Sequence, residues 1–183
     1  MQNRTELRIS LDDGAIDIPY KAGESDHGRI YPYQSLVAAP ELISRIPEVE
    51  EFPELRRALL DINRPNASFE TARVLTWRDS EQGYITCCAI GFHFRNRALF
   101  AQQGQCMLLA GRMLNEMLFH PLMATQITAP MLEIQRANLI AESCSGWIMD
   151  LYLAGHSEES QSAADDELEQ RVAWFAAFLH REG

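Results

Sequence analysis

The chain has 183 residues, of which 46% are hydrophobic, and its formal net charge is −10. This length fits one domain, residues 1–183, with a core large enough that no metal or disulfide is needed to stabilise it. Because there is no dense basic cluster, the composition excludes nucleic-acid binding through phosphate contacts.

Other features of the sequence are typical of a cytoplasmic bacterial protein. The N-terminus lacks the apolar stretch of a signal peptide, and no apolar run reaches the ~18 residues of a membrane span. The four cysteines, at 87, 88, 106 and 144, lack CxxC spacing, so we expect them to be reduced. Lys21 is the only lysine beside fifteen arginines, a bias typical of GC-rich genomes.

The N-terminal third predicts a hairpin followed by short helices. Apolar and polar residues alternate over 5–20, on both sides of the turn-forming sequence Asp12-Asp13-Gly14. The motif Pro-Glu-apolar then occurs three times, and proline suits the first position of a helix. We expect helical turns near 40–46 and 47–52 and a helix over 53–62.

Two runs rich in Val, Thr, Ile, Tyr and Phe, at 69–77 and 83–95, are the strongest strand signal. In the second run the even positions from Tyr84 to Phe94 are mostly large, and the odd positions from Ile85 to His93 are mostly small. Neither face is strongly polar, so this strand should be central and covered on both sides. We expect a helix to lie close against the small-residue face.

Three helices are predicted in the C-terminal half. The first, over 98–119, contains Cys106–Phe119, which is apolar on nearly every side, so we expect it to be sandwiched at the centre of the domain. The second, over 131–154, has apolar residues at alternating spacings of three and four. The third begins at a sequence resembling a capping box, Ser162 with Asp165, and ends at His180 and Arg181.

Together these elements predict an α+β fold: a small antiparallel sheet with an N-terminal hairpin, and three C-terminal helices packed on it. The sequence contains no Gly-rich phosphate loop, no HExxH motif and no pair of histidines at metal-ligand spacing. It therefore predicts no catalytic residues, no metal site and no cofactor, and it favours a protein that is not an enzyme.

His93 is the side chain most suited to a ligand site. It is either an acid–base or ligand-contacting imidazole at the mouth of a pocket, or a partly buried histidine that hydrogen-bonds a backbone carbonyl at the strand end. Arginines near the same end of the sheet could bind an anionic ligand or could simply be solvated. The candidate pocket residues are His93, Tyr84, Arg95 and Arg73.

Aromatic residues extend the apolar face of the last helix beyond what one packing surface needs. Trp174 and Phe178 lie on this helix, and Trp147 lies just off the apolar positions of the preceding one. We expect these three residues to form an interface with a partner protein or with a second copy in a homodimer.

The charge distribution supports a functional hypothesis. Residues 1–61 hold 12 acids and 7 bases, residues 62–136 hold 5 and 7, and residues 137–183 hold 9 and 2. The leading hypothesis is a non-enzymatic acidic module that binds, and so sequesters or escorts, a cationic partner protein, as immunity proteins, antitoxins and secretion chaperones do.

The alternative is a small-molecule-binding protein or enzyme with a pocket beside His93, between sheet and helices. A DNA-mimicking inhibitor would require the acids of 48–54 and 157–169 to form one stripe.

Overall fold

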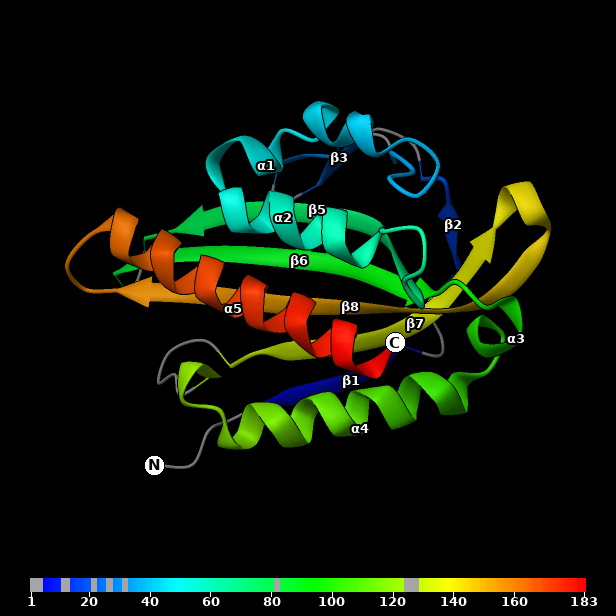
Figure 1. The fold of residues 1–183 in the computed structure, drawn as a ribbon. Helices are drawn as coiled ribbons and strands as arrows, with labels where there is room; N and C mark the ends of the chain where they lie inside the picture. The colour runs from blue at the N-terminus through cyan, green and yellow to red at the C-terminus, as the bar shows by residue number, and fades with distance from the viewer. Residues whose placement is uncertain are drawn as a thin grey trace.

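The computed structural model describes residues 5–10, 14–20, 23–25, 28–30, 33–80, 83–123 and 129–183. Figure 1 shows a curved sheet with a layer of helices over one face. In chain order the strands and helices are β1 (Glu6–Ser10), β2 (Ile16–Ile18), β3 (Gly23–Ser25), β4 (Gly28–Ile30), η1 (Pro40–Arg45), α1 (Glu48–Glu51), α2 (Pro53–Ile62), β5 (Phe69–Asp79), β6 (Tyr84–Phe94), α3 (Arg97–Phe100), α4 (Gln103–Phe119), η2 (Pro121–Met123), β7 (Met131–Leu139), η3 (Ile140–Glu142), β8 (Cys144–Ser157) and α5 (Gln161–Glu182).

The main sheet has the strand order β1-β7-β8-β6-β5, and β2 also pairs with β7. The pairs β5–β6, β6–β8 and β7–β8 are antiparallel, whereas β1 and β2 run parallel to β7. The α+β class is therefore confirmed, and the sheet is mixed rather than antiparallel. The strands predicted over 69–77 and 83–95 are confirmed as β5 and β6, with β6 in the interior of the sheet.

Helices α2, α5 and α4 lie side by side over the same face of the sheet (Figure 1). This face carries the large residues of β6, and Phe92 contacts Phe175 of α5 with ring centroids 5.1 Å apart. The backbone N–H of Glu54, at the start of α2, donates to the Glu169 carboxylate of α5 at 2.9 Å. Trp174 of α5 donates to Glu116 of α4, also at 2.9 Å. α5 is thus the central helix of this layer.

The predicted N-terminal hairpin is wrong. β1 pairs with Met131–Gln135 and β2 with Ala137–Leu139, so both strands follow the same edge of β7 in the same direction. The alternation of apolar residues correctly indicated strands, but alternation does not specify the partner strand. Of the predicted turn, Asp12 and Asp13 lie outside the described residues.

The helix predicted over 131–154 is also wrong, because this segment forms β7, η3 and β8. β8 is an interior strand, and consecutive residues such as Ile148, Met149 and Asp150 are all buried. An interior strand covered on both faces loses the alternation that distinguishes it from a helix. Ser143, in the left-handed region with φ 50°, turns the chain between the two strands.

The single helix predicted over 98–119 is divided into α3 (Arg97–Phe100) and α4 (Gln103–Phe119), and α4 is not sandwiched. One side of it is buried, while Leu108 is 58% and Phe119 is 81% exposed on the other. Nor does it dock on the small-residue face of β6, because all three helices of the layer cover the large-residue face. A Cβ atom at Gly91 would lie 2.6 Å from both Arg73 and Asp150, so neighbouring strands, not a helix, require this face to be small.

The predicted C-terminal helix is confirmed as α5, but it begins earlier than expected. Ser160, not Ser162, is the N-cap, and its hydroxyl accepts a hydrogen bond from the backbone N–H of Ala163. His180 and Arg181 occupy the last turn, as predicted. The helix predicted over 53–62 is confirmed as α2, with Pro53 at its first position.

Candidate functional site

His93 lies in a closed polar cluster at the C-terminal end of β6. Its side chain is fully buried, and Nδ1 lies 3.0 Å from the backbone oxygen of Phe94. Nε2 lies 3.2 Å from a carboxylate oxygen of Glu70 on β5, the residue opposite His93 in the strand pair. The imidazole also packs edge-on against the ring of Phe100. This arrangement matches a histidine that hydrogen-bonds a backbone carbonyl at the strand end.

Two arginines complete the cluster around Glu70. Arg95 and Arg97 each place a guanidinium nitrogen about 4 Å from the Glu70 carboxylate. Burial alone would raise the pKa of Glu70, but His93 and the two arginines outweigh burial and hold the pKa below its usual value. Arg97 also forms a bidentate pair with Glu142, at 2.5 and 2.6 Å. These charges are therefore largely engaged with one another.

Arg73 belongs to a second polar cluster, on the sheet face that the helix layer does not cover. It forms a bidentate ion pair with Asp150 of β8, both distances being 2.7 Å, and Asp150 is fully buried. Gln135 of β7 donates to the same carboxylate. The network joins β5, β8 and β7 across this face, and it satisfies a carboxylate that would otherwise be costly to bury.

The structure does not bring the four candidate pocket residues together. Arg73 lies in the Asp150 cluster, whereas His93 and Arg95 lie in the Glu70 cluster. Tyr84 is exposed and lies at the opposite end of β6 from His93. Nine residues of strand separate the two, which corresponds to about 30 Å.

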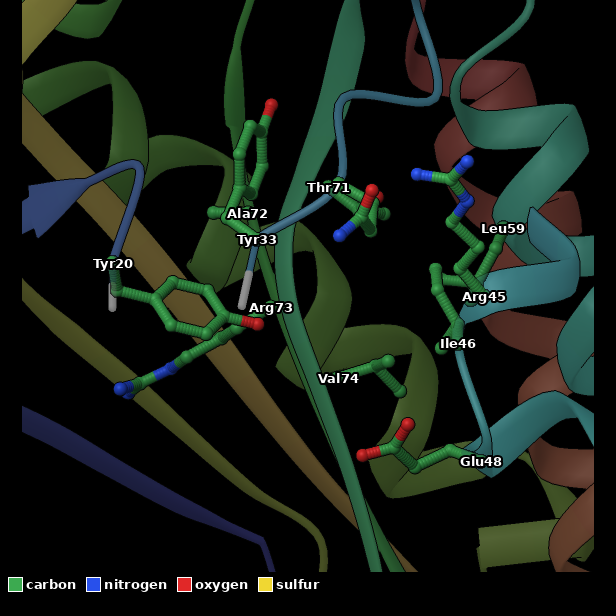
Figure 2. Close-up of a pocket in the computed structure, with 11 residues that line it drawn as sticks. Tyr20, Tyr33, Arg45, Ile46, Glu48, Leu59, Thr71, Ala72, Arg73 and Val74 are labelled. Carbon is green, nitrogen blue, oxygen red and sulfur yellow. The ribbon is translucent and has the colours of Figure 1, made fainter. Parts of the chain in front are cut away.

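Figure 2 shows a small cavity that straddles β5, with Tyr20 and Arg73 on one side of the strand and Glu48 and Val74 on the other. Its volume is about 30 Å³. That is about the volume of one water molecule in the liquid, whereas pockets for small molecules measure roughly 300–1,000 Å³. Burial and the neighbouring Glu48 raise the pKa of Tyr20 to about 12. A metabolite does not fit this cavity.

The three candidate interface aromatics are placed differently from what the sequence indicates. Trp174 is 7% and Phe178 is 1% exposed, and their stacked rings lie 5.8 Å apart. They pack inside the helix layer, where Trp174 bonds to Glu116 of α4 and Phe178 borders an open groove between the two helices. Trp147 is partly buried on β8, and the guanidinium of Arg136 lies over its ring.

Two acidic segments far apart in the sequence meet at one end of the molecule. Residues 48–54 contain four acids and residues 158–169 contain six, with no base in either segment. Arg78 joins them, because its guanidinium lies 2.8 Å from Glu51 and 3.0 Å from Asp165. The Glu169 carboxylate accepts the N–H of Glu54. We call the acids of these two segments the acidic surface.

The carboxylates of the acidic surface affect one another. Burial raises the pKa of Glu169, and the charges of Glu54 and Asp166 raise it further, whereas the hydrogen bond from the Glu54 backbone N–H lowers it. The pKa of Asp165 is lowered instead, because hydrogen bonds from Thr86, Gln161 and Arg78 outweigh its burial. Like charges are therefore crowded at this end of α5.

An open groove begins beside the acidic surface and runs between α2 and α5. Its volume is about 610 Å³, and Glu54 lies at the end next to the acidic surface, with His180 and Arg181 at the other. Its floor is made of alanines on the two helices. The lining residues are Glu54, Arg57, Ala58, Asp61, Ala173, Ala176, Ala177, His180 and Arg181. We call it the α2–α5 groove.

Sequence reasoning missed the α2–α5 groove. Ala173 and Ala177 are four residues apart on α5, so they share one helical face, and Ala177 is exposed. Alanines that interrupt the polar face of an otherwise charged helix were the available signal. Without knowledge that α2 lies beside them, these alanines indicate only a strong preference for helix.

The cysteines are free, and three of them are buried. Burial raises the pKa of Cys87 to about 11 and that of Cys106 to about 12, and it also raises the pKa of Cys88. Since the thiolate is the reactive form, these three thiols are poor nucleophiles at neutral pH.

Within the described part of the chain, no group of three His, Cys, Asp or Glu side chains lies together as a metal site requires. No described helix is long and apolar enough to cross a membrane.

No protein-family model matches the chain, and no curated protein or solved structure shows a significant match to it. The surfaces described above therefore carry the functional interpretation.

Proposed function

We propose that this protein is a non-enzymatic binding module that sequesters or escorts a cationic partner protein. The single observation that carries the proposal is the meeting of the two acidic segments beside the α2–α5 groove. A partner segment would lie in the groove and place its basic side chains over the acidic surface.

The groove suits an amphipathic helix of the partner. α2 has 10 residues, so the groove is long enough to contact about three turns of a helix. Its alanine floor lets another backbone approach closely, and the apolar face of an amphipathic helix would supply contacts there at every third or fourth residue. The charges at the rim would fix the direction in which the segment lies.

The acidic surface beside one end of the groove, rather than the groove lining, supports a basic partner. The lining itself holds Glu54 and Asp61 against Arg57, His180 and Arg181, and Arg57 is paired with Glu54 at 2.5 Å. The end near Glu54 adjoins Asp166 and Glu169, and exposed Glu50 lies in the same surface. Such a potential raises the association rate of a cationic segment and disfavours an anionic one. In contrast, the side chains suited to acid–base chemistry, His93, Glu70 and Asp150, are engaged in the interior of the sheet.

The test uses two synthetic helical peptides as probes, one with lysines and one with glutamates on an otherwise identical alanine-rich amphipathic sequence. We expect the lysine peptide to bind, and its affinity to fall at least about tenfold between about 50 and 400 mM salt, as screening shortens the range of the charges. Fluorescence anisotropy of the labelled peptide measures both quantities.

Variants distinguish peptide binding in the α2–α5 groove from non-specific electrostatic attraction to an acidic protein. Glu50→Lys with Asp166→Lys should weaken lysine-peptide binding, and Ala177→Gln should weaken it by obstructing the floor. Glu142→Lys is the control for each of these two charge reversals made singly, because it also changes the charge by +2, but on η3, away from the groove. Equal binding of both peptides, or equal losses in the control and in the groove variants, would contradict the proposal.

A further inference from the structure

One face of α4 is exposed and largely apolar although the helix is part of the core layer. The residues on this face are Gly104, Leu108, Gly111, Asn115 and Phe119, all of which are exposed. Their spacings of four, three, four and four residues place them along one side of a helix, as in a helix–helix contact. We call this row the α4 seam. Phe119 also borders an open groove of about 460 Å³ between α4 and α5.

The charge of this region differs from that of the rest of the molecule. Between Gln103 and Met123 there is one base, Arg112, and one acid, Glu116. Both are paired with α5: Arg112 with Glu182 at 2.6 Å, and Glu116 with Arg181 at 2.5 Å. The α4 seam is therefore neutral in a chain of net charge −10. Two copies of such a chain repel each other on acidic faces but can meet on a neutral one.

The seam residues of two copies have complementary sizes when their α4 helices lie antiparallel to each other. If a second α4 lies antiparallel, with a two-fold axis between Gly111 and Arg112, Phe119 of each copy faces Gly104 of the other. In the same arrangement Leu108 faces Asn115, and Gly111 lies next to the axis, where the backbones come closest. A Cβ atom built at Gly104 or Gly111 would meet nothing within 4 Å, so both positions are open to an incoming side chain.

We propose that the α4 seam is the interface of a homodimer, in which a second copy of this chain packs its α4 antiparallel across a two-fold axis. A two-fold interface requires that each contact be made twice, and the pairing of Phe119 with Gly104 satisfies this requirement. The two contacts lie about 22 Å apart along the helix, for fifteen residues at about 1.5 Å each. α4 and α2 lie on opposite sides of α5 (Figure 1), so the dimer leaves the α2–α5 groove accessible.

Sedimentation velocity over about 5–300 μM protein tests the dimer. Because a single helical face is a small interface, we expect dissociation in the micromolar range. Added salt should leave the dimer unchanged or strengthen it, because salt screens the repulsion between two chains of charge −10. This salt response is opposite to that expected for the cationic peptide, so the two proposals fail separately.

Three substitutions locate the interface. Phe119→Gln should weaken the dimer at least about tenfold, and Gly104→Leu should do the same by filling the position that Phe119 of the other copy occupies. Ile140→Gln is the control, since Ile140 is 53% exposed but lies on η3. Circular dichroism and thermal melting show whether each variant is folded. A Cβ atom at Gly104 would meet nothing within 4 Å in its own chain. A monomeric wild type up to 300 μM, or a dimer insensitive to both seam variants, would overturn the proposal.

Discussion

At the residue scale, Gly155 allows α5 to lie directly on β8. A Cβ atom at this position would overlap the backbone of Ala164 and Leu168, which cannot move without shifting the helix. We expect Gly155→Ala to lower the free energy of unfolding by about 3 kcal/mol or more. Gly111→Ala, compared at a protein concentration below that of the proposed dimer, is the matched control: within one chain it adds the same methyl group in open space on a helix and should stabilise by about 0.5–1 kcal/mol. Urea denaturation measures both, and equal effects would contradict this packing.

Glu70 gives the stability of the molecule a defined pH dependence. Its folded-state pKa is held below the usual value by His93, Arg97 and Arg95, although burial opposes this. In an unfolded chain a glutamate titrates near about 4.3. The stabilisation is therefore fully present above this pH and is lost as the pH falls through the lower pKa of the folded state.

The variant Glu70→Gln removes this titration. It should be less stable than the wild type at pH 7 by about 1–3 kcal/mol, because the charge interactions of the Glu70 carboxylate with Arg95 and Arg97, and its contact with His93, are lost. The difference should shrink as the pH falls from about 5 towards 3, where the wild-type carboxylate also becomes neutral. Denaturation curves at a series of pH values measure it. A difference that stays constant over this range would show that Glu70 is not stabilised as a carboxylate.

At the scale of elements, Trp174 and Phe178 hold α5 against α4. Because both rings are buried, we expect Trp174→Ala and Phe178→Ala each to lower the free energy of unfolding by about 3–5 kcal/mol. Trp147→Ala, at a partly buried position, should cost less. Urea denaturation followed by far-ultraviolet circular dichroism compares the three. Small losses at Trp174 and Phe178, together with a change in association state, would instead support the interface predicted from the sequence.

The elements with a distinctive local signal could be predicted from the sequence. β5 and β6 carry β-branched and aromatic residues, α2 begins at a proline, and α5 has basic residues in its last turn, although its N-cap is Ser160 and not the predicted Ser162. In each case local preference and tertiary position agree. The α+β class followed from these elements.

β7 could not be predicted, because its local composition contradicts its place in the fold. The sequence MLEIQRANL is rich in strong helix formers, but pairing with β1 on one side and β8 on the other makes it a strand. One signal was available: Gly146 lay inside the predicted helix 131–154, where glycine is unfavourable. A Cβ atom there would overlap Phe100, a contact that no sequence pattern reveals.

The candidate site was still harder to predict, because it depends on pairs of distant residues. The sequence identified both acidic segments, but only the link from Glu51 through Arg78 to Asp165 makes them one surface. His93 is unusual in the sequence, but its place beside Glu70 depends on the pairing of β5 with β6, which the sequence does not show. The apolar content of α4 predicts an interior helix, because a sequence does not distinguish an apolar residue that packs within the chain from one that is exposed on its surface.

At the scale of the whole molecule, charge is separated between the two sides of α5. The α2 side begins at the acidic surface, whereas the α4 side is neutral, with its two charges paired to α5. Crowding acids of like sign at one end destabilises the folded state, since the unfolded chain spreads them apart. Residues that lower stability in this way are typical of binding surfaces.

Asp166→Lys tests whether the acidic surface is stabilised or strained by its own charges. Asp166 is exposed, and it adds to the negative potential at Glu169. Replacing it with a base should raise the free energy of unfolding by about 0.5 kcal/mol at about 10 mM salt, and the gain should disappear near 1 M salt, where screening is nearly complete. Glu142→Lys should instead lower stability, because it breaks the pair with Arg97. Thermal denaturation of both variants at the two salt concentrations measures these effects. If Asp166→Lys lowered stability at low salt, the acids would be mutually compatible within the fold, and their clustering would need no binding role to explain it.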